Sequence, residues 1–237
     1  KEGRLDIGNT IEHALGYIYV QEAASMVPPL ALAPEPGEIV LDMCASPGSK
    51  STQICQMMEN RGILVSNDFT GDRMKPLGLN IQRMGITIAI LTKMYGQWFG
   101  KKGILFDKIL VDAPCSGTGT IRKSPKTLMI WNAKMIERLS VTQGHLLATA
   151  YEALRPGGVI VYSTCSNEPI EDEGVISDFL AAFPDMQLEE IHMDINRSPA
   201  ILEFEGKKFN PEVRKCMRLW PQDNDTEGFF VARLKKN

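Results

Sequence analysis

ILVDAPCSGTG, residues 109–119, decides the fold of this 237-residue chain together with VIVYSTCS, residues 159–166. Each stretch is an apolar, β-rich run that ends abruptly in small and polar residues, and a cysteine follows just past its end: Cys115 in the first, Cys165 in the second. In open α/β sheets, ligands bind outside the carboxyl ends of the strands. If the two strands are neighbours, both thiols therefore lie at the mouth of one pocket.

Predicted strands and helices alternate along the rest of the chain, which indicates an α/β fold. The alternation ends with a predicted helix and three short β-like runs, which we expect to be antiparallel strands at a sheet edge. The runs that predict strands are residues 38–43, 63–66, 86–91, 106–111, 186–192, 217–220 and 228–234, and those that predict helices include residues 71–84, 129–154 and 171–183. Residues 7–26 have apolar residues at roughly helical spacing, and we expect Pro28 and Pro29 to end that helix.

The composition sets limits on compartment and partners. The formal net charge is -3 and the five cysteines contain no C-x-x-C pair, which favours free thiols in a reducing compartment, with the cytoplasm as the expected location. The charge gives no global attraction for a polyanion, so any contact with nucleic acid must come from local patches. No apolar run approaches the roughly 18 residues of a membrane span, so we expect no membrane partner.

The loop CASPGSK, residues 44–50, is the candidate cofactor loop, because its small residues let a ligand approach the backbone at the start of a helix. It lacks G-x-G-x-x-G, so it gives little support for a dinucleotide. Asp68 follows the next strand and suits hydrogen bonds to two ribose hydroxyls, although a helix cap or turn residue is an equally good interpretation.

Two further groups of residues bear on ligands. His13, His145 and His192 have no metal-ligand spacing, so we expect no metal. The loop IRKSPK, residues 121–126, is the best local candidate for phosphate binding, the alternative being an ordinary solvated loop.

An ordered set of motifs resembles the RNA 5-methylcytosine methyltransferases, the family of the Fmu/Sun and NOP2/Sun enzymes. The motifs, in chain order, are GYIYVQEAASM at 16–26, LDMCASPGSKS at 41–51, DAPCSG at 112–117, STCS at 163–166, RLWP at 218–221 and EGFF at 227–230. The resemblance covers nearly the whole chain. It implies a Rossmann-like class I methyltransferase fold, with a mostly parallel seven-stranded sheet and helices on both faces, and S-adenosylmethionine (SAM) as the methyl donor.

The resemblance also assigns roles. Cytosine C5 is a poor nucleophile, so a thiolate must first add to C6, and the family pattern gives that role to Cys165. Cys115 is expected to act in removing the C5 proton or releasing the product, Asp112 to grip the cytosine edge, and Lys50 to face the base or lower the thiol pKa. Taken singly, either cysteine would more often be an inert buried residue. The residues expected to contact SAM are Cys44, Ala45, Ser46, Pro47, Gly48, Ser49, Lys50, Asp68, Arg73 and Asp112.

Several expectations remain open at the level of sequence. Residues 1–35 are expected to be a cap, the end of an upstream RNA-binding region, and residues 36–237 the catalytic domain. Arg73 suits a surface ion pair nearly as well as a ligand contact. Leu91-Thr92-Lys93 lacks the acidic residue that in the family often holds the adenine amine. We expect a monomer acting on RNA, with tRNA slightly favoured over rRNA. The alternatives are a catalytically silent RNA-binding scaffold and a methyltransferase of an exocyclic amine.

Overall fold

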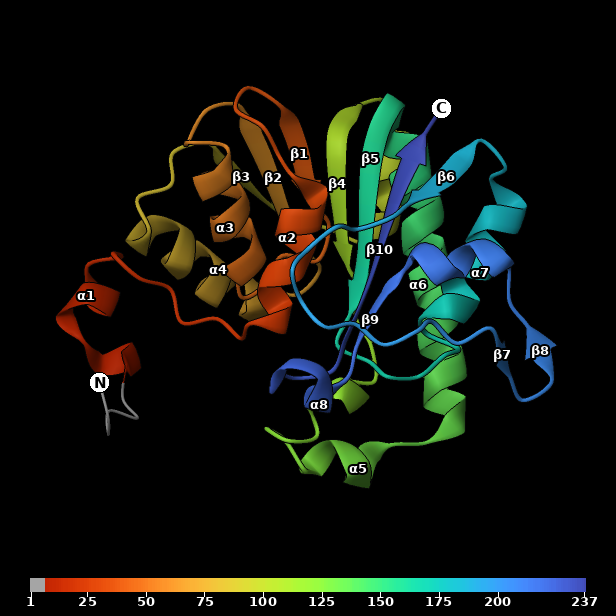
Figure 1. The fold of residues 1–237 in the computed structure, drawn as a ribbon. Coiled ribbons are helices and arrows are strands. Elements are labelled where there is room, and N and C mark those ends of the chain that lie inside the picture. The colour runs from red at the N-terminus through yellow and green to blue at the C-terminus, as the bar shows by residue number, and fades with distance from the viewer. Residues whose placement is uncertain (1–6) are drawn as a thin grey trace.

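Eight strands form one mixed sheet at the centre of the computed structural model, which describes residues 7–237 (Figure 1). The strands are β1 (Ile39–Asp42), β2 (Ile63–Asp68), β3 (Ala89–Lys93), β4 (Phe106–Asp112), β5 (Leu154–Thr164), β6 (Met186–Glu189), β9 (Met217–Leu219) and β10 (Phe229–Lys236). The path across the sheet is β3-β2-β1-β4-β5-β10-β6. The first five strands of this path are parallel, and β10 is antiparallel to its neighbours. The predicted α/β fold is confirmed.

The strand count differs from the seven expected because β6 and β9 share one edge of β10. β9 pairs with Phe229–Val231 at the start of β10, and β6 pairs with its later residues Arg233–Lys236. The path across the sheet therefore still contains seven strands, and β9 is an eighth beside it. A separate hairpin of β7 (Glu203–Phe204) and β8 (Lys207–Lys208) was not among the expected strands.

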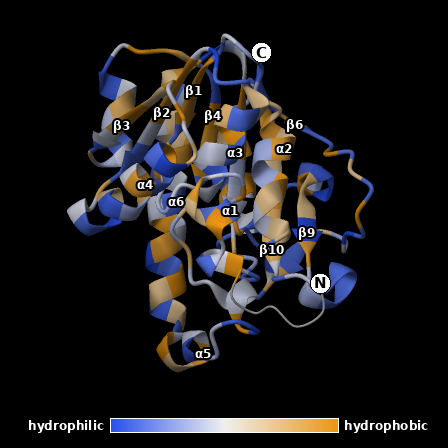
Figure 2. Cartoon of the chain, turned by 90° about the vertical axis from the view of Figure 1, so that its left-hand side faces the viewer, coloured by the Kyte–Doolittle hydropathy of each residue, from blue (hydrophilic) through white to orange (hydrophobic). Residues whose placement is uncertain are grey.

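Helices cover both faces of the sheet, as expected, because consecutive strand residues point to opposite sides. In β4, Ile109 and Val111 pack with α6 and α7, whereas Leu110 packs with α2 and α3. The helices are α1 (Ile11–Ala14), α2 (Val27–Leu32), α3 (Ser49–Met57), α4 (Gly71–Arg83), α5 (Lys126–Ile130), α6 (Ala133–Ala153), α7 (Glu173–Ala182) and α8 (Pro221–Asn224). Figure 2 shows the apolar strands enclosed by helices of mixed polarity.

Three helices differ from the sequence prediction. The helix expected over residues 7–26 is reduced to α1 and two short 3-10 helices, Ile7–Asn9 and Ala24–Met26. Pro28 and Pro29 do not end a helix; they lie in the first turn of α2, where proline is tolerated because its missing N–H would have no intrahelical partner there. The single helix expected over residues 129–154 is divided into α5 and α6. Asn132 causes the break, because its backbone is extended and its side chain accepts a hydrogen bond from the N–H of Met135, as an N-cap does.

The N-terminal residues join the core before the first strand begins. Val27 and Leu32 of α2 are buried against β-strand residues such as Val40 and Leu110. Whether residues 1–35 form a separate cap stays a prediction; residues 1–6 of that segment lie outside the described residues. Within residues 7–237, no helix has the length and apolar character required to cross a bilayer.

The strand order changes direction at β1, which has β2 on one side and β4 on the other. Such a reversal leaves a crevice outside the carboxyl ends of the strands, because the connections on either side run away from each other. The loop after β1 contains residues 44–48, and the loop after β4 contains Cys115. The fold therefore brings the two motif-bearing loops to one crevice.

Candidate active site

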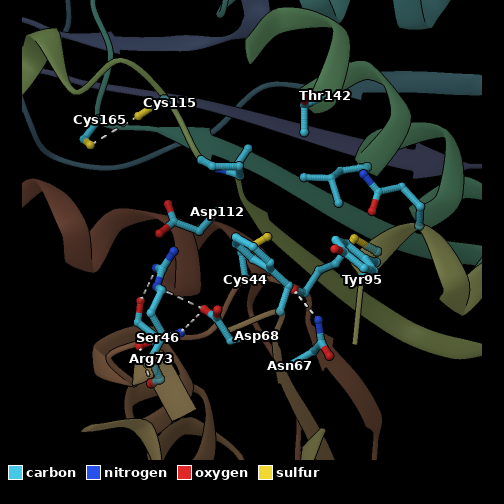
Figure 3. A pocket seen from close by; sticks show the side chains of 17 residues that line it. Cys44, Ser46, Asn67, Asp68, Arg73, Tyr95, Asp112, Cys115, Thr142 and Cys165 are labelled. Atoms are coloured by element: carbon cyan, nitrogen blue, oxygen red, sulfur yellow. Dashed lines mark hydrogen bonds and ion pairs between the residues drawn. The ribbon is translucent and has the colours of Figure 1, made fainter. Parts of the chain in front are cut away.

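The two cysteines lie against each other at the ends of neighbouring strands. β4 and β5 are parallel and place Asp112 opposite Ser163, so the segments that follow the two strands leave the sheet at the same level. The Sγ atoms of Cys115 and Cys165 are 3.3 Å apart (Figure 3). Gly119 keeps the loops close, because its N–H donates to the Cys165 carbonyl at 2.9 Å and a Cβ at this position would lie 2.2 Å from the Gly228 carbonyl oxygen.

Asp112 and Lys50 form an ion pair beside these sulfurs. The Lys50 ammonium donates to Asp112 Oδ2 at 2.8 Å and to Ser25 Oγ at 2.9 Å. The Ser163 hydroxyl donates to the other oxygen, Oδ1, at 2.7 Å, so β5 holds the carboxylate in place. Lys50 reaches this position from the first turn of α3, where it is almost fully buried. Lys50 is therefore a buried positive charge close to the Cys165 thiol.

The two thiols have different affinities for a proton. The hydrogen bond between the two cysteines lowers the pKa of Cys165, and the Lys50 charge lowers it further, against burial and the Asp112 charge. The pKa of Cys115 is raised well above its usual value by that same hydrogen bond, by burial and by the charges of Cys165 and Glu171. Burial alone would lower the pKa of Lys50, but its contacts with Asp112 raise it overall. Of the two cysteines, Cys165 is therefore the one that gives up its proton more readily.

A cavity of about 450 Å³ opens in front of this pair. Its size falls in the range of roughly 300–1,000 Å³ typical of small-molecule sites. It runs from Cys165, Cys115 and Asp112 past the β1 loop to the end of β2, as Figure 3 shows. The lining residues that had been expected at the cofactor are Cys44, Ser46, Asp68, Arg73 and Asp112.

Asp68 is the group in this cavity best suited to a nucleoside. It is 2% exposed, and its oxygens receive only long bonds, at 3.4 Å, from the N–H groups of Ser46 and Thr70 and an ion pair with Arg73 at the same distance. The carboxylate therefore keeps the capacity to accept two further hydrogen bonds, as the ribose diol of SAM requires. Arg73 fixes the β1 loop, because its Nη2 donates to the Ser46 carbonyl at 3.0 Å. The cavity thus fits the adenosyl part of SAM.

Aromatic residues that sequence reasoning missed form the far part of the cavity. Phe69, Tyr95 and Gln97 line it, and the rings of Phe69 and Tyr95 are stacked with centroids 6.0 Å apart. Tyr95 and Gln97 follow β3, in the region where an acidic partner for adenine had been sought and not found. A search for aromatic as well as acidic residues after that strand would have identified Tyr95.

A second cavity, of about 290 Å³, lies on the other side of Cys165. Asp112, Ala113 and Cys165 line both cavities, so the thiolate lies where they meet. Tyr19, Glu22, Ser25, Thr120, Lys123, Glu227 and Phe229 also line the second cavity. Some of these residues belong to motifs used for the resemblance, GYIYVQEAASM and EGFF, to which sequence reasoning gave no role at the site.

The expected cofactor loop is divided between the two cavities. Pro47, Ser49 and Lys50 line the second cavity and not the larger one, and their contact with the cofactor stays a prediction. Ala45 and Gly48 line neither. Ala45 donates its N–H to the Asn67 carbonyl at 2.8 Å, and Gly48 turns the chain into α3 with a φ of 105°, a value that favours glycine. Their contact with a cofactor stays a prediction.

The other three cysteines supply no further reactive thiol to the Cys115–Cys165 pair, and Cys44 lines the larger cavity. Burial raises the pKa of the Cys44 thiol far above its usual range, so this cysteine stays protonated. Cys55 and Cys216 are buried in the two halves of the core, as expected. Among residues 7–237 no group of three histidine, cysteine or acidic side chains is placed to hold a metal ion. The expectation that no metal is needed stays a prediction.

This chain matches the model of one protein family and is similar in sequence to several RNA methyltransferases. The family model of the 16S rRNA methyltransferases RsmB/F matches residues 29–235. The tRNA (cytosine(49)-C(5))-methyltransferase of Pyrococcus abyssi is 45% identical over 98% of this chain and 74% of its own length. Ribosomal RNA small subunit methyltransferase F of Shewanella loihica is 42% identical over 98% of this chain, which spans only 47% of that relative.

Solved structures agree with this fold. A methyltransferase homologue from Pyrococcus horikoshii has a TM-score of 0.88 at 39% identity, over 99% of this chain and 73% of its own. NSun6 from the same organism, determined with the SAM analogue SFG, has a TM-score of 0.85 at 34% identity, over 97% of this chain and 56% of its own. The Rossmann-like methyltransferase fold is therefore confirmed.

Proposed function

This chain belongs to the RsmB/F family of SAM-dependent RNA cytosine-C5 methyltransferases, and we propose that it forms 5-methylcytosine in tRNA through a covalent bond from Cys165 to C6 of the target base. One observation carries the proposal: the sulfur of Cys165, 3.3 Å from that of Cys115, lies where a nucleoside-sized cavity and a second cavity meet. The larger cavity holds the cofactor, and the second receives the cytosine.

Cys165 is the nucleophile. Its thiolate adds to C6 of the cytosine, and the electron pair of the C5–C6 bond moves through the ring toward N3. The Asp112–Lys50 pair lies next to this sulfur, and its lysine supplies the positive charge that the ring needs as it becomes electron-rich. C5 is now nucleophilic. SAM, when bound, supplies a methyl group on a positively charged sulfur, which C5 can attack.

Asp68 and the Phe69–Tyr95 pair would hold that cofactor. Asp68 has the free acceptor capacity for the ribose, and the two rings offer an apolar surface for adenine. Asp112, whose Oδ1 accepts from Ser163, lies at the end of the cavity nearest the thiols and orients the reacting groups.

Cys115 has a later role, in removing the C5 proton. While Cys165 is a thiolate, its charge and its hydrogen bond hold the proton on Cys115. Both causes disappear once the Cys165 sulfur is bonded to carbon, so the pKa of Cys115 falls and it gives its proton to solvent water. The Cys115 thiolate then accepts the C5 proton, and the C6–sulfur bond breaks to release Cys165.

The relatives favour tRNA over rRNA. The tRNA enzyme of Pyrococcus abyssi is 45% identical to this chain, and ribosomal RNA small subunit methyltransferase F of Shewanella loihica is 42% identical. Lys123 lines the second cavity and belongs to the basic loop 121–126. It can therefore contact an RNA phosphate next to a bound cytosine. The described cysteines are all free, which suits the reducing cytoplasm as the place of action. We expect a monomer.

Single-turnover methyl transfer tests the proposal. The protein is mixed with labelled SAM and either tRNA or small-subunit rRNA transcripts, and the RNA is digested and analysed by mass spectrometry. We expect labelled 5-methylcytosine from tRNA, with position 49, the site named for the Pyrococcus abyssi relative, as the first cytosine to examine. Label on N4 would support the exocyclic-amine alternative, and no label on any RNA would support the silent scaffold.

A further inference from the structure

A buried carboxylate, Glu171, joins the loops of both cysteines. Each cysteine is followed by a serine, Ser116 or Ser166, and both serine hydroxyls donate to the same oxygen of Glu171, Oε2. The Ser166 bond measures 2.6 Å. The two hydroxyls also lie 3.1 Å from each other. Glu171 is therefore bonded to the residue after each sulfur, although it lies 55 positions from the first serine and 5 from the second.

The other oxygen of Glu171 holds the loop from a second direction. The N–H of Ser116 donates to Oε1 at 2.9 Å, and so does the side-chain amide of Gln143 at the same distance. That amide also donates to the Pro114 carbonyl at 2.9 Å. Helix α6, through Gln143, thus fixes the chain immediately before Cys115, and Glu171 fixes the chain immediately after it.

Besides its hydrogen bonds to both cysteine loops, Glu171 has an electrostatic effect on a nearby thiol. It is fully buried, and within residues 7–237 no lysine, arginine or histidine forms an ion pair with it, whereas its neighbours Asp172 and Glu173 both pair with Arg218. No paired cation from the described residues screens this carboxylate, so its charge acts on nearby titratable side chains. One of them is Cys115, whose pKa the Glu171 charge helps to raise.

We propose that Glu171 is a positioning residue for the proposed methyl transfer: it holds the two thiols in contact and keeps the negative charge on Cys165 and the proton on Cys115. The charged groups that act on Cys115 are Cys165 and Glu171, and those that act on Cys165 are Asp112 and Lys50. Glu171 disfavours a thiolate at one sulfur while Lys50 favours it at the other. This inference rests on the proposed function for its catalytic meaning, but the thiol chemistry itself can be measured without RNA or SAM.

Glu171→Gln gives the direct test. The glutamine keeps the size and one acceptor oxygen for Ser116 N–H and Gln143, and its amide can donate to the serine hydroxyls, which accept as well as donate. The charge alone is lost. Iodoacetamide labelling of each cysteine is followed by peptide mass spectrometry over about pH 6–10, where thiolates form. In the unaltered protein the label goes first to Cys165. In the glutamine variant we expect the share on Cys115 to rise by about fivefold or more.

Two further variants make the result decisive. Glu168→Gln is the matched control, because its carboxylate is on the same segment but bonds to Trp131 and not to a cysteine loop; we expect unchanged labelling. Glu171→Asp keeps the charge but shortens the reach. We expect it to keep the label on Cys165, while covalent trapping on RNA that contains 5-fluorocytosine slows by about fivefold or more.

The inference is wrong if folded Glu171→Gln labels as the unaltered protein does. It is equally wrong if Glu171→Asp forms the adduct at the original rate, a test that still stands where thermal unfolding shows that the glutamine variant does not fold. Failure of the proposed function gives a different pattern: the labelling would change with Glu171 as described, while the unaltered protein would transfer no methyl group to RNA.

Discussion

The sulfur atoms of Cys115 and Cys165 lie 3.3 Å apart, although fifty residues separate them in the chain. The contact exists because β4 and β5 are adjacent and parallel, so both strands deliver their following residues to one edge of the sheet. At this distance the two sulfur atoms can share one proton in a hydrogen bond. The pair therefore behaves as a unit, in which the hydrogen bond between the sulfurs has the largest effect on both pKa values, and the charges of Lys50 and Glu171 act on Cys165 and Cys115 respectively.

The first prediction separates the roles of the two cysteines. RNA containing 5-fluorocytosine cannot lose the substituent at C5, so an enzyme that attacks C6 and transfers the methyl group stays bonded to it. We expect Cys165→Ala to abolish the adduct, because no sulfur attacks C6. We expect Cys115→Ala to form it as well as the unaltered protein or better, because its role comes later. Denaturing gel electrophoresis of labelled RNA measures both, and the reverse pattern would exchange the assignments.

The second prediction concerns the charge at Lys50. Replacing it by methionine keeps the length of the side chain but removes a cation that lowers the pKa of Cys165, and it leaves the Asp112 charge unopposed. The pKa of Cys165 must then rise. We expect iodoacetamide labelling of Cys165 at neutral pH to slow by about tenfold or more, with the labelling curve displaced to higher pH.

Lys108→Met is the control for this change. Lys108 lies on the same strand as Asp112, at the other end, and forms a comparably buried ion pair with Glu38 at 3.0 Å. Its loss should lower stability without moving the labelling curve of Cys165. Identical curves for the Lys50 and Lys108 variants would show that the lysine does not control the thiol.

The third prediction tests the cofactor cavity through Asp68. Asp68→Asn keeps the shape but replaces one acceptor oxygen by a donor and removes the charge that a ribose diol would bind. We expect the affinity for S-adenosylhomocysteine, measured by isothermal titration calorimetry, to fall by about tenfold or more. Asp72 lies in the first turn of α4 and its side chain is almost fully exposed, so Asp72→Asn should leave the affinity for S-adenosylhomocysteine unchanged. Equal affinities for both variants would remove Asp68 from the cofactor site.

Sequence reasoning located the parts of this site that depend on local pattern. An apolar run followed by Asp112-Ala113-Pro114-Cys115 predicts a strand end with a thiol, and the structure has β4 end at Asp112. It could not find partners that meet only in the folded chain. Glu171 is the first residue of the predicted helix over residues 171–183, and its hydrogen bonds to Ser116 cross 55 positions. Tyr95 was missed because an acidic residue was the expected signal after β3.

The fourth prediction concerns RNA binding at Lys123. This lysine is exposed and lines the cavity proposed for the cytosine, so it suits a phosphate next to the target base. We expect Lys123→Ala to raise the KM for RNA severalfold with little change in kcat, and to reduce the salt dependence of RNA binding by about one phosphate contact. Lys75→Ala on α4, which lines neither cavity, is the control. A KM unaffected by the Lys123 change would place the RNA backbone elsewhere.

The fifth prediction follows from Asp42, at the end of β1. Burial raises its pKa to about 7, against the bond that Ser51 Oγ donates to Oδ2 at 2.6 Å, and its Oδ1 has no partner within the described part of the chain. The folded protein therefore keeps a proton on Asp42 that the unfolded chain releases near pH 4. Because the folded state binds more protons between about pH 4 and pH 7, this residue makes stability fall as pH rises through that window and level off above it.

Asparagine has no carboxyl group to titrate, so the Asp42→Asn variant should not lose this stability as the pH rises. The difference in the free energy of unfolding between variant and unaltered protein, from urea titrations at about pH 5 and pH 8, should move in favour of the variant by on the order of 3 kcal/mol as the pH rises. The unpaired buried amide of asparagine carries a cost, but that cost is the same at both pH values and cancels in the comparison. Asp72→Asn, exposed and without such burial, should show no change between the two pH values. Parallel stability curves for the Asp42 variant and the unaltered protein would mean that Asp42 stays ionised in the fold, and that the polar groups around β1 compensate for its burial.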